Sequence, residues 1–99
     1  MVEVKILDVK GKKVQGVRIP APGGEGHPNM LIIQGEKGYI MCGYLNLGTS
    51  EAVGDVAAVI GGATFEDLLA NPVKAISPEA EKLGIAVGMS GEQVVEIIA

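Results

Sequence analysis

The sequence has very few aromatic side chains: it contains no tryptophan, one phenylalanine and two tyrosines, so aromatics make up 3% of its 99 residues. Because stacking on aromatic rings is a main way of holding single-stranded nucleic acid, this scarcity argues against such binding. The net charge of −4 adds repulsion from phosphate backbones. We therefore expect no nucleic-acid partner, and we expect a core built from aliphatic side chains.

Cysteine and histidine occur once each, as Cys42 and His27. A single cysteine cannot form an internal disulfide, and one cysteine with one histidine leaves a four-ligand zinc site half filled. The acidic residues are scattered without the spacing of a metal-binding cluster or of an acid–base pair. We therefore expect neither a metal nor a cofactor.

Long apolar runs are also missing, since no run approaches the ~20 residues that a membrane-spanning helix needs. The first residues alternate charged with apolar side chains, whereas a signal peptide has a continuous apolar stretch. These features predict a cytoplasmic protein without a membrane partner. Apolar residues nonetheless make up 47% of the sequence, which is enough for one self-supporting domain over residues 1–99.

The first half of the chain has the patterns of β-strands. Residues 2–9 and 12–19 contain apolar side chains with a period of two, and Gly11 between them predicts a hairpin turn. Val14 is out of phase with the apolar residues that follow it, so Gly16 is a candidate β-bulge that would absorb the slip.

Two further strands are predicted in the middle of the chain. Residues 21–29 are rich in glycine and proline and predict an exposed loop. Residues 30–34 and 39–45 are then almost continuously apolar, which is typical of strands buried on both faces. We expect these two strands to be central in the sheet.

The second half alternates helical patterns with a short strand. Thr64, Ser77 and Ser90 are candidate capping residues before three helices, a brief helical turn is expected over residues 49–53, and residues 56–61 predict a strand. The order of elements favours an α+β domain, with N-terminal β-hairpins in a mixed sheet covered by about three helices.

Four stretches of the sequence resemble the YunC-like family of small bacterial and archaeal proteins. In order, they are PNMLII, GYIMCGYLN, TFEDLL and LGIAVGMSGEQVVEII, and they lie within residues 28–98. The resemblance implies an α+β domain but no catalytic residues, because the family has no assigned function. The family often has an aspartate where this chain has Asn46, and an asparagine cannot ionise, so chemistry that needs a carboxylate there is not implied.

Cys42 is the first candidate site residue. A nucleophilic thiol needs a nearby cation, imidazole or helix N-terminus, and His27 is the only imidazole. Antiparallel pairing across the turn near residues 36–37 would set Cys42 opposite about residue 31 and carry the loop of His27 close. Because cysteine is often buried and the flanking residues are apolar, we predict an unreactive, buried thiol. A Cys42 nucleophile with His27 as its base is the alternative.

Five other residues are candidate ligand contacts. Asn29 adjoins His27 and could orient a ligand, and Gly43 in a strand could let a ligand approach closely. Asn46, Ser90 and Gly91 lie at the starts of predicted helices, where free N–H groups attract anions. Ordinary helix capping and tight packing explain the same residues without a ligand.

The sequence assigns no reaction, and three function classes remain. The leading interpretation is a small binding or assembly module that forms a homo-oligomer, because a mean hydropathy of +0.35 implies more apolar surface than one small core hides. The alternative is an enzyme acting on a small molecule, neutral or anionic, through Cys42 and His27. A third class is a heteromeric partner that completes another protein's site.

Overall fold

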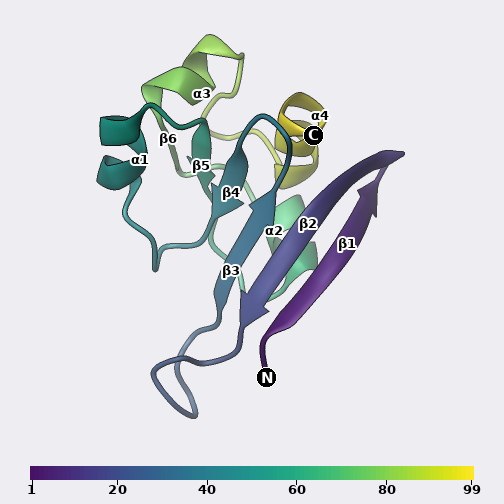
Figure 1. The fold of residues 1–99 in the computed structure, drawn as a ribbon, viewed down its shortest axis with the longest axis vertical. Helices are drawn as coiled ribbons and strands as arrows, with labels where there is room; N and C mark the ends of the chain where they lie inside the picture. Colours follow the sequence, from purple (N-terminus) through teal and green to yellow (C-terminus); the bar gives the residue numbers. More distant parts are fainter.

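A six-stranded sheet runs through the molecule with its strands in the order of the sequence (Figure 1). The computed structural model describes residues 1–99. The strands are β1 (Glu3–Val9), β2 (Lys12–Ile19), β3 (Met30–Gln34), β4 (Tyr39–Met41), β5 (Ala57–Val59) and β6 (Ala75–Ile76). Neighbouring strands are antiparallel except for β4 and β5, which are parallel. The sheet is therefore mixed, as predicted, and β3 and β4 are its centre, but β4 ends at Met41 and not at residue 45 as predicted.

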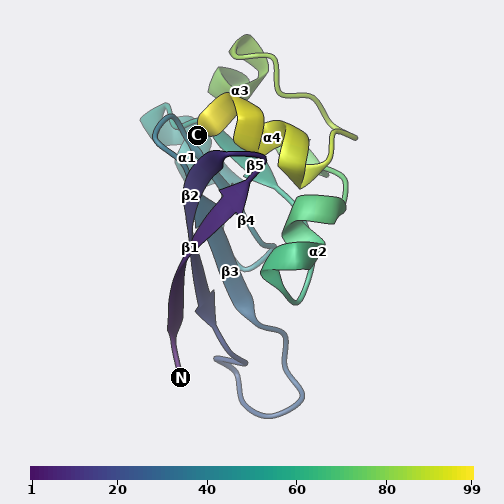
Figure 2. The same ribbon diagram turned by 90° about the vertical axis from the view of Figure 1, so that its right-hand side faces the viewer.

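Four helices accompany the sheet: α1 (Leu47–Val53), α2 (Phe65–Ala70), α3 (Pro78–Lys82) and α4 (Gly91–Ile98). Figure 2 shows α2 and α4 together on one side of the sheet. The helix α1 connects the parallel strands β4 and β5, as a parallel pair requires a crossover. None of the helices is both long and apolar enough to cross a membrane. The predicted α+β class is confirmed.

Local signals determine where most of these helices begin. The side-chain oxygens of Thr64, Ser77 and Ser90 each accept a backbone N–H from the first turn of the helix that follows. The first helix begins earlier than the sequence predicted, at Leu47, because the side chain of Asn46 already caps it. Capping by side chains satisfies N–H groups that have no partner inside the helix.

The hairpin of β1 and β2 is regular, and the bulge expected at Gly16 is absent. The two strands pair residue for residue, with Leu7 opposite Val14 and Lys5 opposite Gly16. Val14 is buried toward the helices, so the change of phase reflects apolar side chains on both faces of β2. A glycine at position 16 is explained by packing, because a Cβ at this position would lie 2.7 Å from the ring of Phe65 in α2. The glycine lets that ring lie against the strand.

The main core is a cluster of 17 buried residues between one face of the sheet and the helices. Its fully buried members come from central strands and from both covering helices, and they include Leu31, Ile33, Ile40, Leu68, Val94, Val95 and Ile98. Burying an aliphatic side chain of this size contributes about 1.5–3 kcal/mol. This cluster holds the loops at the ends of β4 and β5 in place.

The other face of β1–β3 has no helix over it (Figures 1 and 2). On this face, Val2, Val4 and Ile6 are 56%, 60% and 64% exposed. The strand register places half-buried apolar side chains of β2 and β3 beside them. We call this surface the open face, and it consists of Val2, Val4, Ile6, Val17, Ile19 and Ile32.

Candidate functional site

A pocket of about 310 Å³ lies beyond the carboxyl ends of the parallel strands β4 and β5. Because the strands are parallel, the chain leaves both of them at the same edge of the sheet, and ligands of α/β proteins commonly bind at such an edge. We call it the β4/β5 pocket. Its lining consists of Pro28, Asn29, Cys42, Gly43, Tyr44, Gly61 and Gly62. The pocket thus brings together three of the predicted site residues, Asn29, Cys42 and Gly43.

Cys42 belongs both to the pocket wall and to the core cluster. Its residue is only 4% exposed, which confirms the prediction of a buried thiol. The Cys42 N–H donates to the Leu31 carbonyl at 3.1 Å, and the Leu31 N–H donates to the Cys42 sulfur at 3.3 Å. Cys42 is therefore opposite residue 31, as the position of the turn predicted.

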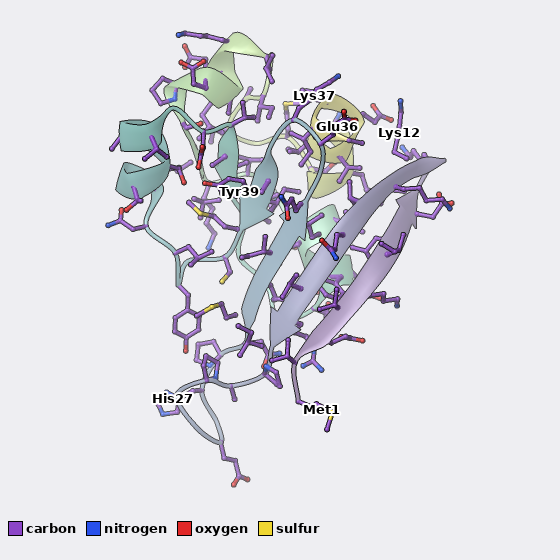
Figure 3. The ribbon with its side chains drawn as sticks, viewed as in Figure 1. Met1, Lys12, His27, Glu36, Lys37 and Tyr39 are labelled. Carbon is purple, nitrogen blue, oxygen red and sulfur yellow. The ribbon has the colours of Figure 1, made fainter.

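His27 lies on the exposed loop that projects from the end of the sheet (Figure 3). Its imidazole packs at Gly23 within that loop, and the residue is not part of the pocket lining. The adjacent Pro28 does line the pocket, and its carbonyl accepts a hydrogen bond from the Tyr44 hydroxyl at 3.3 Å. The loop is thus close to Cys42, as predicted, but the structure does not place the imidazole in the pocket wall.

Both ends of the Asn29 amide are used within the chain. Its oxygen accepts the Ala21 N–H at 3.0 Å, and its nitrogen donates to the Ala63 carbonyl at 2.9 Å. These bonds join the glycine- and proline-rich loop to the segment that follows β5. Asn29 therefore fixes the shape of the pocket wall.

The other predicted ligand contacts lie away from this pocket and have structural partners. Asn46 accepts the Gly48 N–H at 2.7 Å as the cap of α1. Ser90 forms a reciprocal capping box with Gln93. A Cβ at Gly91 would lie only 1.8 Å from the Leu68 carbonyl oxygen, so the glycine allows α4 to touch the backbone of α2.

Lys74 is a neighbour of the pocket that the sequence did not indicate. A Cβ at Gly61 would lie 2.7 Å from the Lys74 ammonium nitrogen, so this cation rests against the pocket wall. Lys74 takes part in none of the four ion pairs of the structure. No sequence pattern connects Lys74 with Gly61, although the Gly61-Gly62 pair directly after a short strand marks a close backbone approach.

A second polar cluster, formed by Tyr39, Ser50 and Asp55, lies beside α1. The Tyr39 hydroxyl donates to the Asp55 carboxylate at 2.7 Å and lies 2.6 Å from the Ser50 hydroxyl. Because a tyrosine has one hydroxyl proton, Ser50 must donate to Tyr39. Burial raises the pKa of Tyr39; the Ser50 hydrogen bond opposes this rise and Asp55 adds to it. The cluster fastens the crossover helix to β4.

Comparison with known proteins assigns the family. Residues 41–98 match the family described as a domain of unknown function (DUF1805). The chain belongs to the DUF1805 family. The matched segment includes five residues of the pocket lining: Cys42, Gly43, Tyr44, Gly61 and Gly62.

Two relatives of this DUF1805 chain span nearly its whole length. It is 32% identical to the uncharacterized protein YunC of Bacillus subtilis (strain 168) over 98 residues, which cover 94% of this chain and 93% of the relative. The crystal structure of a protein of unknown function, TA1206 from Thermoplasma acidophilum, is similar with a TM-score of 0.89 and 36% identity. That match covers 100% of this chain and 94% of the other. The predicted YunC-like resemblance is confirmed.

No group of three or more His, Cys, Asp or Glu side chains lies close enough together to hold a metal ion. The pocket lining itself contains no His, Asp or Glu, and its titratable side chains are Cys42 and Tyr44. The chemistry that the wall offers is therefore backbone hydrogen bonding, a sulfur atom and an aromatic ring.

Proposed function

We propose that this chain is a non-catalytic binding module that holds a small molecule in the β4/β5 pocket. The observation that carries the proposal is the pocket itself, of about 310 Å³, at the carboxyl ends of the parallel strands. Glycines on both of its loops, Gly43 and Gly61-Gly62, let a ligand approach the backbone. Small-molecule sites are commonly concave and preformed in this way.

The same wall favours binding over thiol catalysis. A nucleophilic cysteine needs a partner that takes its proton or stabilises its thiolate. The lining offers no imidazole or carboxylate for this purpose, and Cys42 is packed into the core cluster. We therefore assign Cys42 to the wall of the site and treat its reaction with His27 as the alternative.

A ligand screen by thermal shift tests this proposal, with Gly43→Leu as the variant that obstructs the pocket. A Cβ at Gly43 meets no atom within 4 Å, so the added side chain enters open space at the pocket wall. Ala52→Leu, on the exposed surface of α1, is the matched control. We expect at least one compound to raise the melting temperature of the wild type and of Ala52→Leu but not of Gly43→Leu. Equal responses from all three proteins to every active compound would overturn the proposal.

Alkylation separates the binding module from the thiol enzyme. We expect iodoacetamide to label Cys42 more slowly in the folded protein than in the denatured protein, because the residue is 4% exposed. His27→Ala should leave the folded rate unchanged, because the imidazole is not part of the pocket lining. A folded-state rate above the denatured rate that falls in His27→Ala would instead establish the enzymatic alternative.

We further propose that a second copy of this chain covers the open face. Among the charged side chains next to this surface, Asp8 and Lys13 pair with each other at 2.6 Å, and Glu36 lines a hollow with Ile6 and Lys13. On this face the strands β1 and β2 thus contribute no net charge, and a two-fold axis can bring their apolar side chains onto one another without repulsion between like charges of these strands. Two sheets that pack face to face through aliphatic side chains form a common and stable arrangement.

Sedimentation of matched lysine variants tests this assembly. Ile6 lies on the open face and is 64% exposed, whereas Val53 lies on α1 and is 65% exposed. We expect Ile6→Lys to dissociate the oligomer and Val53→Lys to leave it intact, because only the first places a charge inside the contact. A wild type that sediments as a strict monomer at high concentration would exclude the assembly.

A further inference from the structure

The loops of the β4/β5 pocket contain backbone donors that the fold does not use. The N–H groups of Gly43, Tyr44, Gly61 and Gly62 donate no hydrogen bond within the chain. Sheet bonding ends just before them: the Cys42 and Ile60 N–H groups still donate, to Leu31 and Met41. The four free donors therefore belong to two adjacent loops that line one pocket.

The Lys74 ammonium lies at the same loops. It rests against Gly61, where a Cβ on the glycine would lie 2.7 Å from the ammonium nitrogen. It is exposed and has no acidic partner, whereas four other cationic side chains of the protein are paired with carboxylates. An unpaired positive charge thus lies beside Gly61, one of the four lining residues with a free N–H.

Acidic side chains do not neutralise this arrangement from within the pocket. The lining contains no Asp or Glu. Asp67 packs against Gly62 from outside the lining, and its carboxylate oxygen accepts the Ala63 N–H at 3.0 Å at the start of α2. Asp67 is thus engaged by the backbone outside the lining, while the protein as a whole carries a net charge of −4.

We infer that the ligand of the β4/β5 pocket carries an oxyanion, a carboxylate or a phosphate, which is held by the free N–H groups of the two glycine loops and by Lys74. Several backbone N–H groups converging from neighbouring loops form a site for anions, and a lysine adds a point charge. The glycines permit close approach of the oxygens to the backbone. This inference rests on the proposed binding function and specifies the chemistry of its ligand.

Nuclear magnetic resonance with two simple probes tests the inference. Inorganic phosphate and acetate are titrated separately into the ¹⁵N-labelled protein, with sodium chloride of equal ionic strength as the baseline. We expect saturable shifts of the amide resonances of Gly43, Tyr44, Gly61 and Gly62. Saturation by phosphate alone identifies a phosphate ligand, and saturation by acetate alone identifies a carboxylate.

Two charge-matched variants sharpen the test. Lys74→Gln should weaken the binding of the active probe about fivefold, because it removes one exposed charge contact. Lys12→Gln removes the same charge at the opposite end of the sheet from the loop of His27 (Figure 3) and should leave the affinity unchanged. Equal losses in both variants would show a general charge effect and overturn the assignment of Lys74.

The outcomes also separate this inference from the proposed function on which it rests. If neither probe produces saturable shifts at the four amides, the oxyanion site is refuted. A neutral compound that then stabilises the wild type but not Gly43→Leu leaves the binding module standing with a different ligand. If no compound of any charge distinguishes Gly43→Leu from the wild type, both proposals fail together.

Discussion

The strands β1–β3 and the unit of β4, α1 and β5 belong to one sheet, but they differ in how their strands are connected and in what covers them. Tight antiparallel pairing joins β1 to β2, and no helix covers the open face. The parallel pair β4 and β5 requires a crossover, and α1 supplies it. The crossover also makes both strands end at one edge, where their loops form the pocket. The change from antiparallel to parallel pairing therefore brings two loops together around a pocket.

The two regions also differ in how their outward side chains are used. On β1, the outward residues Val4 and Ile6 are apolar and exposed. On β4, the outward residue Tyr39 instead bonds to Ser50 and Asp55, which fasten α1 to the strand. Polar bonds can fasten a short crossover helix in one geometry, whereas an apolar sheet face suits packing against another surface. We therefore propose the ligand site in one region and the assembly surface in the other.

The largest expected effect concerns the helix layer that both regions share. Gly91→Ala should reduce the free energy of unfolding by about 3 kcal/mol, because its Cβ would collide with the backbone of α2 at Leu68. Gly43→Ala is the matched control: its Cβ meets nothing within 4 Å, and we expect a change within about 0.5 kcal/mol. Denaturant unfolding of both variants provides the measurement. Similar losses in the two variants would contradict the close contact of α2 and α4.

The next effect separates the crossover unit from the rest of the sheet. Tyr39→Phe should cost about 1–3 kcal/mol, because it leaves the buried Ser50 and the half-buried Asp55 without their shared partner. Tyr44→Phe loses only a 3.3 Å bond at a residue that is 43% exposed, so its loss should be under about 1 kcal/mol. Equal losses would show that the cluster does not stabilise the crossover.

The pH dependence of folding stability tests the Tyr39 cluster in a second way. Burial raises the pKa of its hydroxyl, so the folded state keeps this proton longer than the unfolded state. The resulting contribution to stability is complete below the unfolded pKa of about 10 and is lost as the pH rises through the folded pKa. We expect the stability of wild type to fall more steeply above pH ~10 than that of Tyr39→Phe. Equal slopes of stability against pH for the two proteins would contradict a raised pKa of Tyr39.

Much of the fold could be predicted because its signals are local. Capping residues such as Thr64 and Ser90 and the turn at Gly11 act on their immediate neighbours. The bulge at Gly16 was a wrong prediction, because the ring that requires this glycine comes from Phe65, far along the chain. Strand β6, only two residues long, has no periodicity from which it could be predicted.

The candidate site could also be predicted where a local turn fixes a residue's position. The turn between β3 and β4 fixes the register, so the position of Cys42 opposite residue 31 followed from the sequence. The sequence also predicted that the loop of His27 lies close to Cys42. The position of a loop, however, does not determine where its imidazole points. Lys74 was missed because its position against Gly61 results from the pairing of β5 with the chain before β6. Contacts between loops depend on the assembled sheet, and no local pattern records them.

The smallest effect belongs to the tip of the β1–β2 hairpin, where the open face ends. The Lys13 ammonium and the Gly11 N–H both donate to Asp8, and they lower the pKa of its carboxyl group. The contribution of this carboxylate to stability is therefore present above the unfolded pKa of about 4 and is lost as the pH falls through the lower, folded pKa. Asp8→Asn should flatten the dependence of the melting temperature on acid pH slightly, and Glu51→Gln, which removes an exposed carboxylate on α1, should not. If both variants follow the wild type, the ion pair at the tip contributes nothing measurable to stability, as solvent screening allows for an exposed pair.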